Sequence, residues 1–138
     1  MANDSFNLQR FVTAQAPVYA DVCAELRSGQ KTSHWMWFIF PQIAGLGQSA
    51  MSKKYAISGL DEARAYLAHS VLGLRLFECT RLVGASRRPI EDIFGSPDDM
   101  KFRSSMTLFA RAQGEGVFND AIEKYCGGKF DEATLMKL

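Results

Sequence analysis

The segment between Lys31 and Gln42, KTSHWMWFIFPQ, holds one histidine, two tryptophans and two phenylalanines. Rings at this density either fill a core or bind a flat ligand. At helical spacing Trp35 and Phe38 lie together on one face, whereas His34 and Trp37 are neighbours on another. We therefore expect most of the rings to be buried, and His34 and Trp37 to face a cleft.

Two polar residues of this segment could bind a ligand or transfer a proton. His34 either makes a hydrogen bond at a helix start or, because imidazole titrates near neutrality, contacts a ligand and donates a proton. Gln42 follows Pro41 and either caps a turn or reads the edge of a base or an amide. The residues themselves leave both choices open.

A second polar group lies between Asp98 and Ser105. Acids at a helix start commonly compensate the helix dipole, which is one reading of Asp98 and Asp99. Lys101, Ser104 and Ser105 lie within one turn, so a single face would reach a phosphate or ribose hydroxyls. With the aromatic wall this pattern predicts a nucleotide-type pocket. Further candidate phosphate partners are Arg75, Arg81, Arg87 and Arg88.

Metal and cofactor chemistry are not expected. The chain has two histidines and contains no Walker loop, HExxH or GxSxG motif. The Gly45–Gly47 segment is read as a turn, because no strand precedes it and no third glycine opens a helix. The three cysteines are widely spaced without a CxxC pair, which predicts inert thiols in a reducing compartment.

Length and charge narrow the class of protein. The 138 residues, 47% hydrophobic and 22% charged, predict one globular domain over residues 1–138. A net charge of +1 argues against binding duplex nucleic acid, although a local basic patch would still bind phosphate. No apolar run approaches a membrane span and no leader pattern opens the chain, so a cytoplasmic protein is expected.

Helical spacing dominates the chain, and this predicts an all-α, multi-helix fold. Ser33 is expected to cap a helix over residues 35–40, with a buried strand as the alternative. Ser58 with Asp61 resembles a capping box, and Ser70 is expected to cap the next helix.

The clearest predicted helix start is Ser96–Asp99, with an N-cap, a proline and two acids. In that helix Phe102, Met106 and Phe109 share the buried face, which leaves Lys101, Ser104 and Ser105 for other faces. Asp131 is expected to cap a short last helix.

Three stretches carry a resemblance to a known family. They are LQRFVTAQ from Leu8, SHWMWFIFPQIAGLGQS from Ser33 and DDMKFRSSMTLF from Asp98, joined by an EA-x-x-YL-x-H-x-x-LG-x-RL pattern from Glu62. The chain resembles the DUF 1810 family, of unknown function, over nearly its whole length. Ser70 stands where the pattern more often has proline. Some members carry a calpastatin label, which does not suit a compact helical domain.

The order of a histidine-bearing aromatic helix, an LG-x-R element and a D-x-x-K helix is also similar to the NADAR (YbiA-like) family. That resemblance implies a cleft for ADP-ribose and cleavage of an N-glycosidic bond. NADAR proteins usually have a glutamate where Ser33 stands here.

On this resemblance, a carboxylate near the anomeric carbon would stabilise the positive charge that develops on the sugar. Asp99 is the first candidate, followed by Asp98 and Glu78. His34 would protonate the departing base. The other implied roles are stacking by Trp35 or Trp37, and diphosphate binding by Lys101 with Arg75.

Three functions remain open. The chain is either a hydrolase of ADP-ribose-type substrates, a non-catalytic module for a nucleotide-like ligand, or an interaction protein with a wholly buried aromatic block. Neither a protein partner nor an oligomeric state is predicted.

Overall fold

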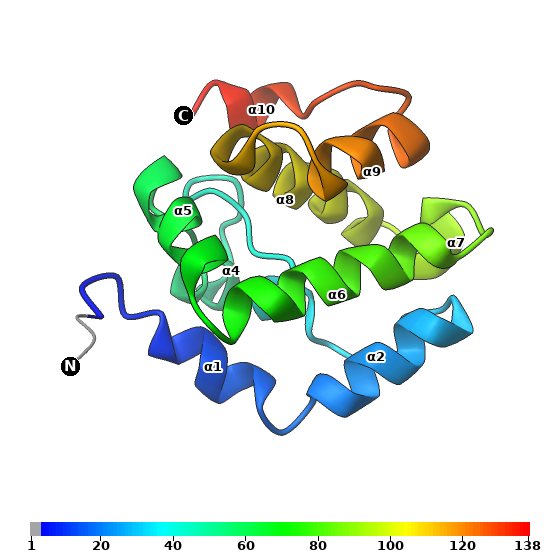
Figure 1. Cartoon of the computed structure of the whole chain (residues 1–138), viewed down its shortest axis with the longest axis horizontal. Helices are drawn as coiled ribbons and strands as arrows, with labels where there is room; N and C mark the ends of the chain where they lie inside the picture. The colour runs from blue at the N-terminus through cyan, green and yellow to red at the C-terminus, as the bar shows by residue number, and fades with distance from the viewer. Residues whose placement is uncertain (1–3) are drawn as a thin grey trace.

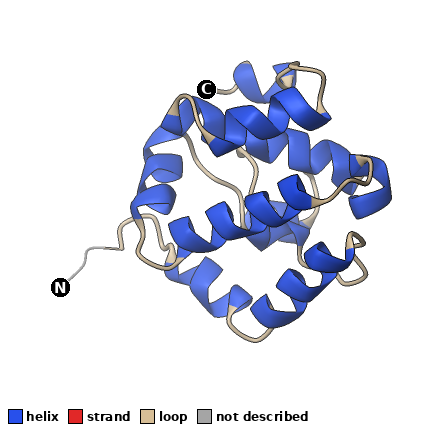
Figure 2. Ribbon diagram, turned by 45° about the vertical axis from the view of Figure 1, so that its right-hand side comes forward, coloured by secondary structure: helices blue, strands red, loops and turns tan. Residues whose placement is uncertain are grey.

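Ten α-helices, and no β-strand, are formed by residues 4–138, which are the residues that the computed structural model describes (Figures 1 and 2). The helices are α1 Gln9–Gln15, α2 Tyr19–Ser28, α3 Met36–Ile39, α4 Ala50–Lys54, α5 Leu60–Ala68, α6 Leu72–Ala85, α7 Ile90–Phe94, α8 Asp98–Gln113, α9 Val117–Tyr125 and α10 Glu132–Leu135. The predicted all-α class is confirmed. Residues 1–3 of the predicted domain lie outside the described part.

Helix α8 forms the centre of the packing and contacts α5, α7, α9 and α10. Helix α6 runs below α8 in the view of Figure 1 and packs on α2, α5 and α9. One hydrophobic core runs through these contacts. Among residues 4–138 no helix has both the length and the apolar character needed to span a bilayer.

Burial of α8 is wider than its apolar face predicts. Phe102, Met106 and Phe109 are fully buried as expected, but Ser104 and Ser105 are buried too. The faces left for the two serines are therefore covered as well, because α8 has neighbours on several sides. Ser104 is accommodated by donating a hydrogen bond to Asp131 Oδ2 at 2.8 Å.

The aromatic segment divides between core and surface. Helix α3 is shorter than the predicted 35–40, since Trp35 precedes it and Phe40 ends it. Trp35 and Phe38 are buried, Trp37 is half-buried and His34 is exposed. The expectation that most of these rings are buried is confirmed.

Two helix starts use capping residues other than the predicted ones. Glu62 Oε1 accepts hydrogen bonds from the backbone N and the Oγ of Ser58 at 2.8 and 2.9 Å. The acidic partner of Ser58 at the start of α5 is therefore Glu62 and not the predicted Asp61. At the start of α6, His69 Nδ1 accepts from two backbone N–H groups, where Ser70 was predicted. An imidazole nitrogen aimed along the chain satisfies the same orphan donors as a serine hydroxyl.

Helix α8 begins at Asp98, one residue after the proline that was predicted to hold its first position. Pro97 is the residue before it, and it follows a cis peptide bond with Ser96, whose side chain makes no cap bond. At the last helix Asp131 accepts from the backbone N of Thr134 at 3.3 Å, which confirms the predicted cap.

Candidate functional site: a groove between the aromatic segment and the start of helix α8

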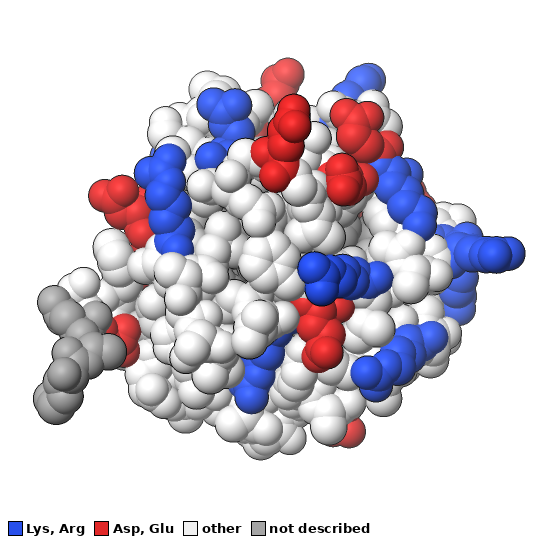
Figure 3. All heavy atoms as spheres, viewed as in Figure 1, with Lys and Arg blue, Asp and Glu red and all other residues white. Residues whose placement is uncertain are grey.

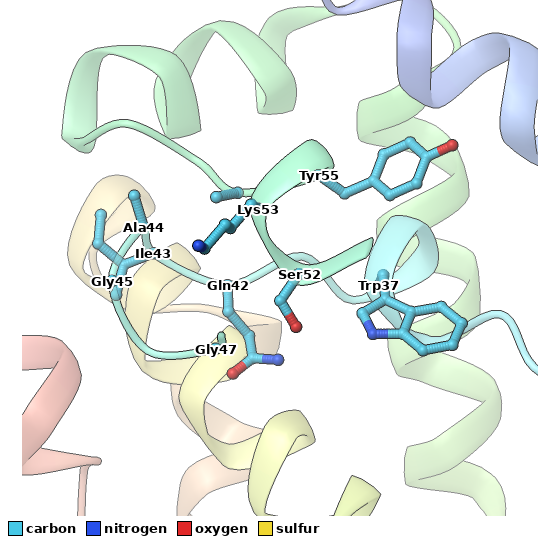
Figure 4. A pocket seen from close by; sticks show the side chains of 10 residues that line it. Trp37, Gln42, Ile43, Ala44, Gly45, Gly47, Ser52, Lys53 and Tyr55 are labelled. Carbon is cyan, nitrogen blue, oxygen red and sulfur yellow. The ribbon is translucent and has the colours of Figure 1, made fainter. Parts of the chain in front are cut away.

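Three adjoining hollows form one groove. The first, of about 140 Å³, lies between Trp37, Gln42 and Ser52 (Figure 4). The second, of about 260 Å³, lies between Trp37 and Lys101. The third, of about 250 Å³, has Gln42, Ser52 and Lys101 in its wall. Because each hollow shares wall residues with the other two, we treat them as a single groove.

A short backbone pairing holds the floor of the first hollow. The N–H of Ile57 donates to the carbonyl of Gln42 at 2.9 Å, and the N–H of Ala44 donates to the carbonyl of Ile57 at 2.8 Å. Figure 4 shows the Gln42 and Ser52 side chains between Trp37 and the loop at Gly45. The chain after Pro41 is thus held by two hydrogen bonds rather than by a helix, which leaves side chains free to line a cavity.

The second hollow is cationic. Asp98 is bound by two ammonium groups, from Lys31 at 2.9 Å and from Lys101 at 3.4 Å. Both lysines also lie over indole rings, Lys31 at 5.2 Å from Trp35 and Lys101 at 5.6 Å from Trp37. Two positive charges against one negative charge leave the hollow with a net attraction for anions.

Glu25 of α2 fixes the chain that enters the groove. Its Oε1 accepts hydrogen bonds from the N–H groups of Thr32 and Ser33 at 2.6 and 2.9 Å, and from Trp35 Nε1 at 3.1 Å. Partial burial acts to raise the pKa of Glu25, but these donors together outweigh it and lower that pKa to about 2. The carboxylate therefore remains charged and holds the segment in place.

Six of the residues predicted to form a site line this groove. They are His34, Trp37, Gln42, Asp98, Lys101 and Ser104. Trp35 also reaches the second hollow, but it is only 1% exposed and belongs chiefly to the core. The structure thus brings together two segments separated by more than fifty residues of sequence.

Other predicted residues lie apart from the walls of these hollows. Arg75 and Glu78 belong to α6 and contact Tyr19 of α2, where the tyrosine hydroxyl donates to Glu78 Oε1 and the guanidinium lies 4.7 Å from the ring. Ser105 is fully buried and its Oγ has no hydrogen-bond partner among residues 4–138. Asp99 follows the groove residue Asp98, and its Oδ1 is buried without a partner in the same described part of the chain.

The three cysteines are free thiols that are at least partly buried. Cys23 and Cys79 are buried, and burial raises the pKa of both, that of Cys79 to about 12. Cys126 is half-buried, and burial raises its pKa as well. Thiols that stay protonated are poor nucleophiles, in agreement with the predicted inert role.

Sequence reasoning missed Lys31, Ser52 and Glu25. Lys31 and Ser52 line the groove, while Glu25 acts from behind it. Of the three, only Lys31 could have been found from the sequence, because it is the first residue of the aromatic segment. Residues 4–138 contain no cluster of three or more His, Cys, Asp or Glu side chains suited to a metal ion.

Comparison with known proteins supports one of the two resemblances. A family model described as a protein of unknown function, DUF1810, matches residues 5–138. The crystal structure of the conserved hypothetical protein Rv1873 from Mycobacterium tuberculosis is 55% identical in sequence, covers 98% of each chain and has a TM-score of 0.96. No match was found among curated proteins. The similarity to NADAR proteins and the calpastatin label are not confirmed by these matches.

Proposed function

Because the chain belongs to the DUF1810 family of proteins of unknown function, we propose its function from the groove alone: it binds a nucleotide-like ligand. The observation that carries the proposal is the meeting of Trp37, Gln42 and Lys101 around three connected hollows. An aromatic wall, an amide and an ammonium group are what a base and its phosphate require.

The first hollow suits one flat ring. An engineered protein cavity of about 150 Å³ binds benzene, and the hollow beside Gln42 has about 140 Å³. The Gln42 side chain lines this hollow, where its amide can meet the edge of a base or of a carboxamide. The two further hollows give room for a sugar and phosphates, as in ADP-ribose.

The second hollow suits an anion. Lys101 is 27% exposed at its side chain, whereas Lys31 is 8% exposed and is held by Asp98. Lys101 is therefore the lysine free to turn toward a ligand while Lys31 keeps the aspartate neutralised. The exposed His34 stands at the mouth of the same hollow.

Binding is better supported than hydrolysis, because the carboxylates in the groove are already engaged. Asp98 binds two lysines, and Asp131 accepts from Ser104 and from Thr134. A carboxylate whose oxygens are occupied in this way has fewer lone pairs free to contact an attacking water.

One observation favours N-glycosidic hydrolysis as the second candidate function. Asp99 Oδ1 is buried without a hydrogen-bond partner among residues 4–138, and a catalytic role is one of the explanations of such an unpaired atom. If the protein is a hydrolase, Asp99→Asn abolishes turnover of an ADP-ribosylated substrate and preserves ligand affinity and fold. An unchanged rate removes Asp99 from the mechanism.

The binding proposal is tested by amide-resolved NMR titration with AMP, ADP-ribose and ribose 5-phosphate. We expect saturable shifts at His34, Trp37 and Lys101. Ribose 5-phosphate should bind more weakly than AMP because it lacks the aromatic base. Lys101→Met should weaken AMP about tenfold, the effect of losing one charge-assisted hydrogen bond. The matched control Lys129→Met changes an exposed lysine outside the groove. Absence of shifts at millimolar ligand, or equal effects of both variants, overturns the proposal.

A further inference from the structure

A group of cations continues the positive charge of the groove along the surface. Arg27 lies in the last turn of α2, and the αL residue Gly29 ends that helix. The Arg88 side chain packs against Gly29, where an added Cβ would lie 2.9 Å from Arg88 Cδ. Two residues further on, Lys31 enters the cationic hollow. Arg27, Arg87 and Arg88, here called the basic rim, thus lie in this contact or within two residues of it in sequence.

The three arginines of the basic rim form no ion pair within residues 4–138. No carboxylate lies within ion-pair distance of its three guanidinium groups among residues 4–138, whereas Lys31 and Lys101 share Asp98. All three arginines are exposed. Figure 3 shows Lys and Arg side chains gathered on the side of the molecule where α2 ends and α6 leads into α7, with few acidic atoms between them.

One arginine has an ordinary structural explanation, and the others do not share it. Arg27 complements the dipole of α2 from its last turn. Arg87 and Arg88 follow the end of α6 instead, in the turn before α7. The acids at the start of α7, Glu91 and Asp92, offset part of this charge without pairing with it. Guanidinium groups left open in this way are suited to bidentate binding of phosphate.

We propose that the ligand is the terminal nucleotide of a single-stranded nucleic acid, with the following phosphates bound on the basic rim. This inference rests on the proposed function, since it places one nucleotide in the groove. A base must be unpaired to enter a hollow of about 140 Å³, which excludes the interior of a duplex. An aromatic wall beside a cationic track is the arrangement that single-strand-binding surfaces share.

The experiment compares AMP with an unlabelled, 5′-phosphorylated single-stranded adenylate tetranucleotide, which has one phosphate for the groove and three for the rim, by calorimetric titration at 50, 100 and 200 mM salt. Three phosphate contacts on the rim add about −2 to the slope of log K against log salt, at about −0.7 per contact on a single strand. We therefore expect the tetranucleotide to bind at least about tenfold tighter than AMP at 50 mM salt, and to lose that advantage as salt rises.

The triple variant R27Q/R87Q/R88Q should remove the extra slope and leave AMP affinity unchanged. The control R64Q/R111Q/K129Q removes the same charge from exposed residues elsewhere and should leave both affinities within about twofold. Trp37→Leu should weaken both ligands in the wild-type background.

The results separate the inference from the function on which it rests. If AMP binds but the tetranucleotide binds no tighter, or if both triple variants act alike, the nucleic-acid inference is overturned and the groove proposal stands. If the tetranucleotide binds through the rim without any effect of Trp37→Leu, the end-binding geometry is wrong. If neither ligand binds at 50 mM salt, both proposals fail.

Discussion

Replacing Glu25 with Gln should destabilise the protein and remove a pH dependence. The variant keeps an oxygen acceptor for Thr32, Ser33 and Trp35 but loses the negative charge that strengthens all three hydrogen bonds. A pKa lowered from 4.5 to about 2 corresponds to at most about 3 kcal/mol, at about 1.4 kcal/mol per unit. Since water reaches this partly buried carboxylate, we expect about 2 kcal/mol at neutral pH.

The sign of the pH effect follows from the lowered pKa. The folded protein holds Glu25 ionised more strongly than the unfolded chain does, so the stabilisation is complete above pH 4.5. It is lost as the pH falls from 4.5 through about 2. The difference in unfolding free energy between wild type and Glu25→Gln should therefore shrink by more than half at pH 3.

Urea unfolding followed by tryptophan fluorescence at pH 7 and pH 3 measures this difference directly. Glu123→Gln, at an exposed glutamate of α9, serves as the control and should change the unfolding free energy by less than about 0.5 kcal/mol. A Glu25→Gln difference that is equal at the two pH values, or absent at pH 7, would refute the assigned role of the carboxylate.

Three further substitutions test the packing around the groove and the core. Gly73→Ala should cost at least about 2 kcal/mol in thermal unfolding, because its Cβ would lie 2.1 Å from the carbonyl oxygen of Leu67; an unchanged Tm would contradict this close approach. Gly47→Ala would place a Cβ 2.4 Å from the Ser52 side chain, which lines the groove, and should weaken AMP binding with little change in Tm. A lowered Tm with unchanged AMP affinity would count against a ligand site here. His69→Ala should cost about 1 kcal/mol by removing the cap of α6, which chemical denaturation would detect.

Local signals sufficed for much of the fold because they act within a few residues. Gly29 ends α2 in the left-handed conformation, and the acids after Pro97 begin α8. Both effects depend on the backbone of one turn. By contrast, the burial of Ser104 and Ser105 depends on which helices surround α8, and this information lies in residues far along the chain.

The same distinction explains how much of the candidate site could be predicted. Helical spacing separates Trp37 from Trp35, and the structure confirms that one is half-buried and the other is core. Spacing says nothing about which distant helix a side chain will meet. Glu78 therefore pairs with Tyr19 on α2, while Lys31, ordinary in sequence, meets Asp98 across the groove.

The groove exists because one aromatic segment serves two purposes. Trp35 gives its ring to the core and its indole N–H to Glu25, so the chain from Thr32 onward is fixed from behind. Trp37, two residues later, is half-buried against the core and lies beside Lys101. If the groove binds a ligand as proposed, its positioning by the core is a form of preorganisation, which reduces the entropy cost of binding. For this reason Glu25, which touches no hollow, belongs to the site as a positioning residue.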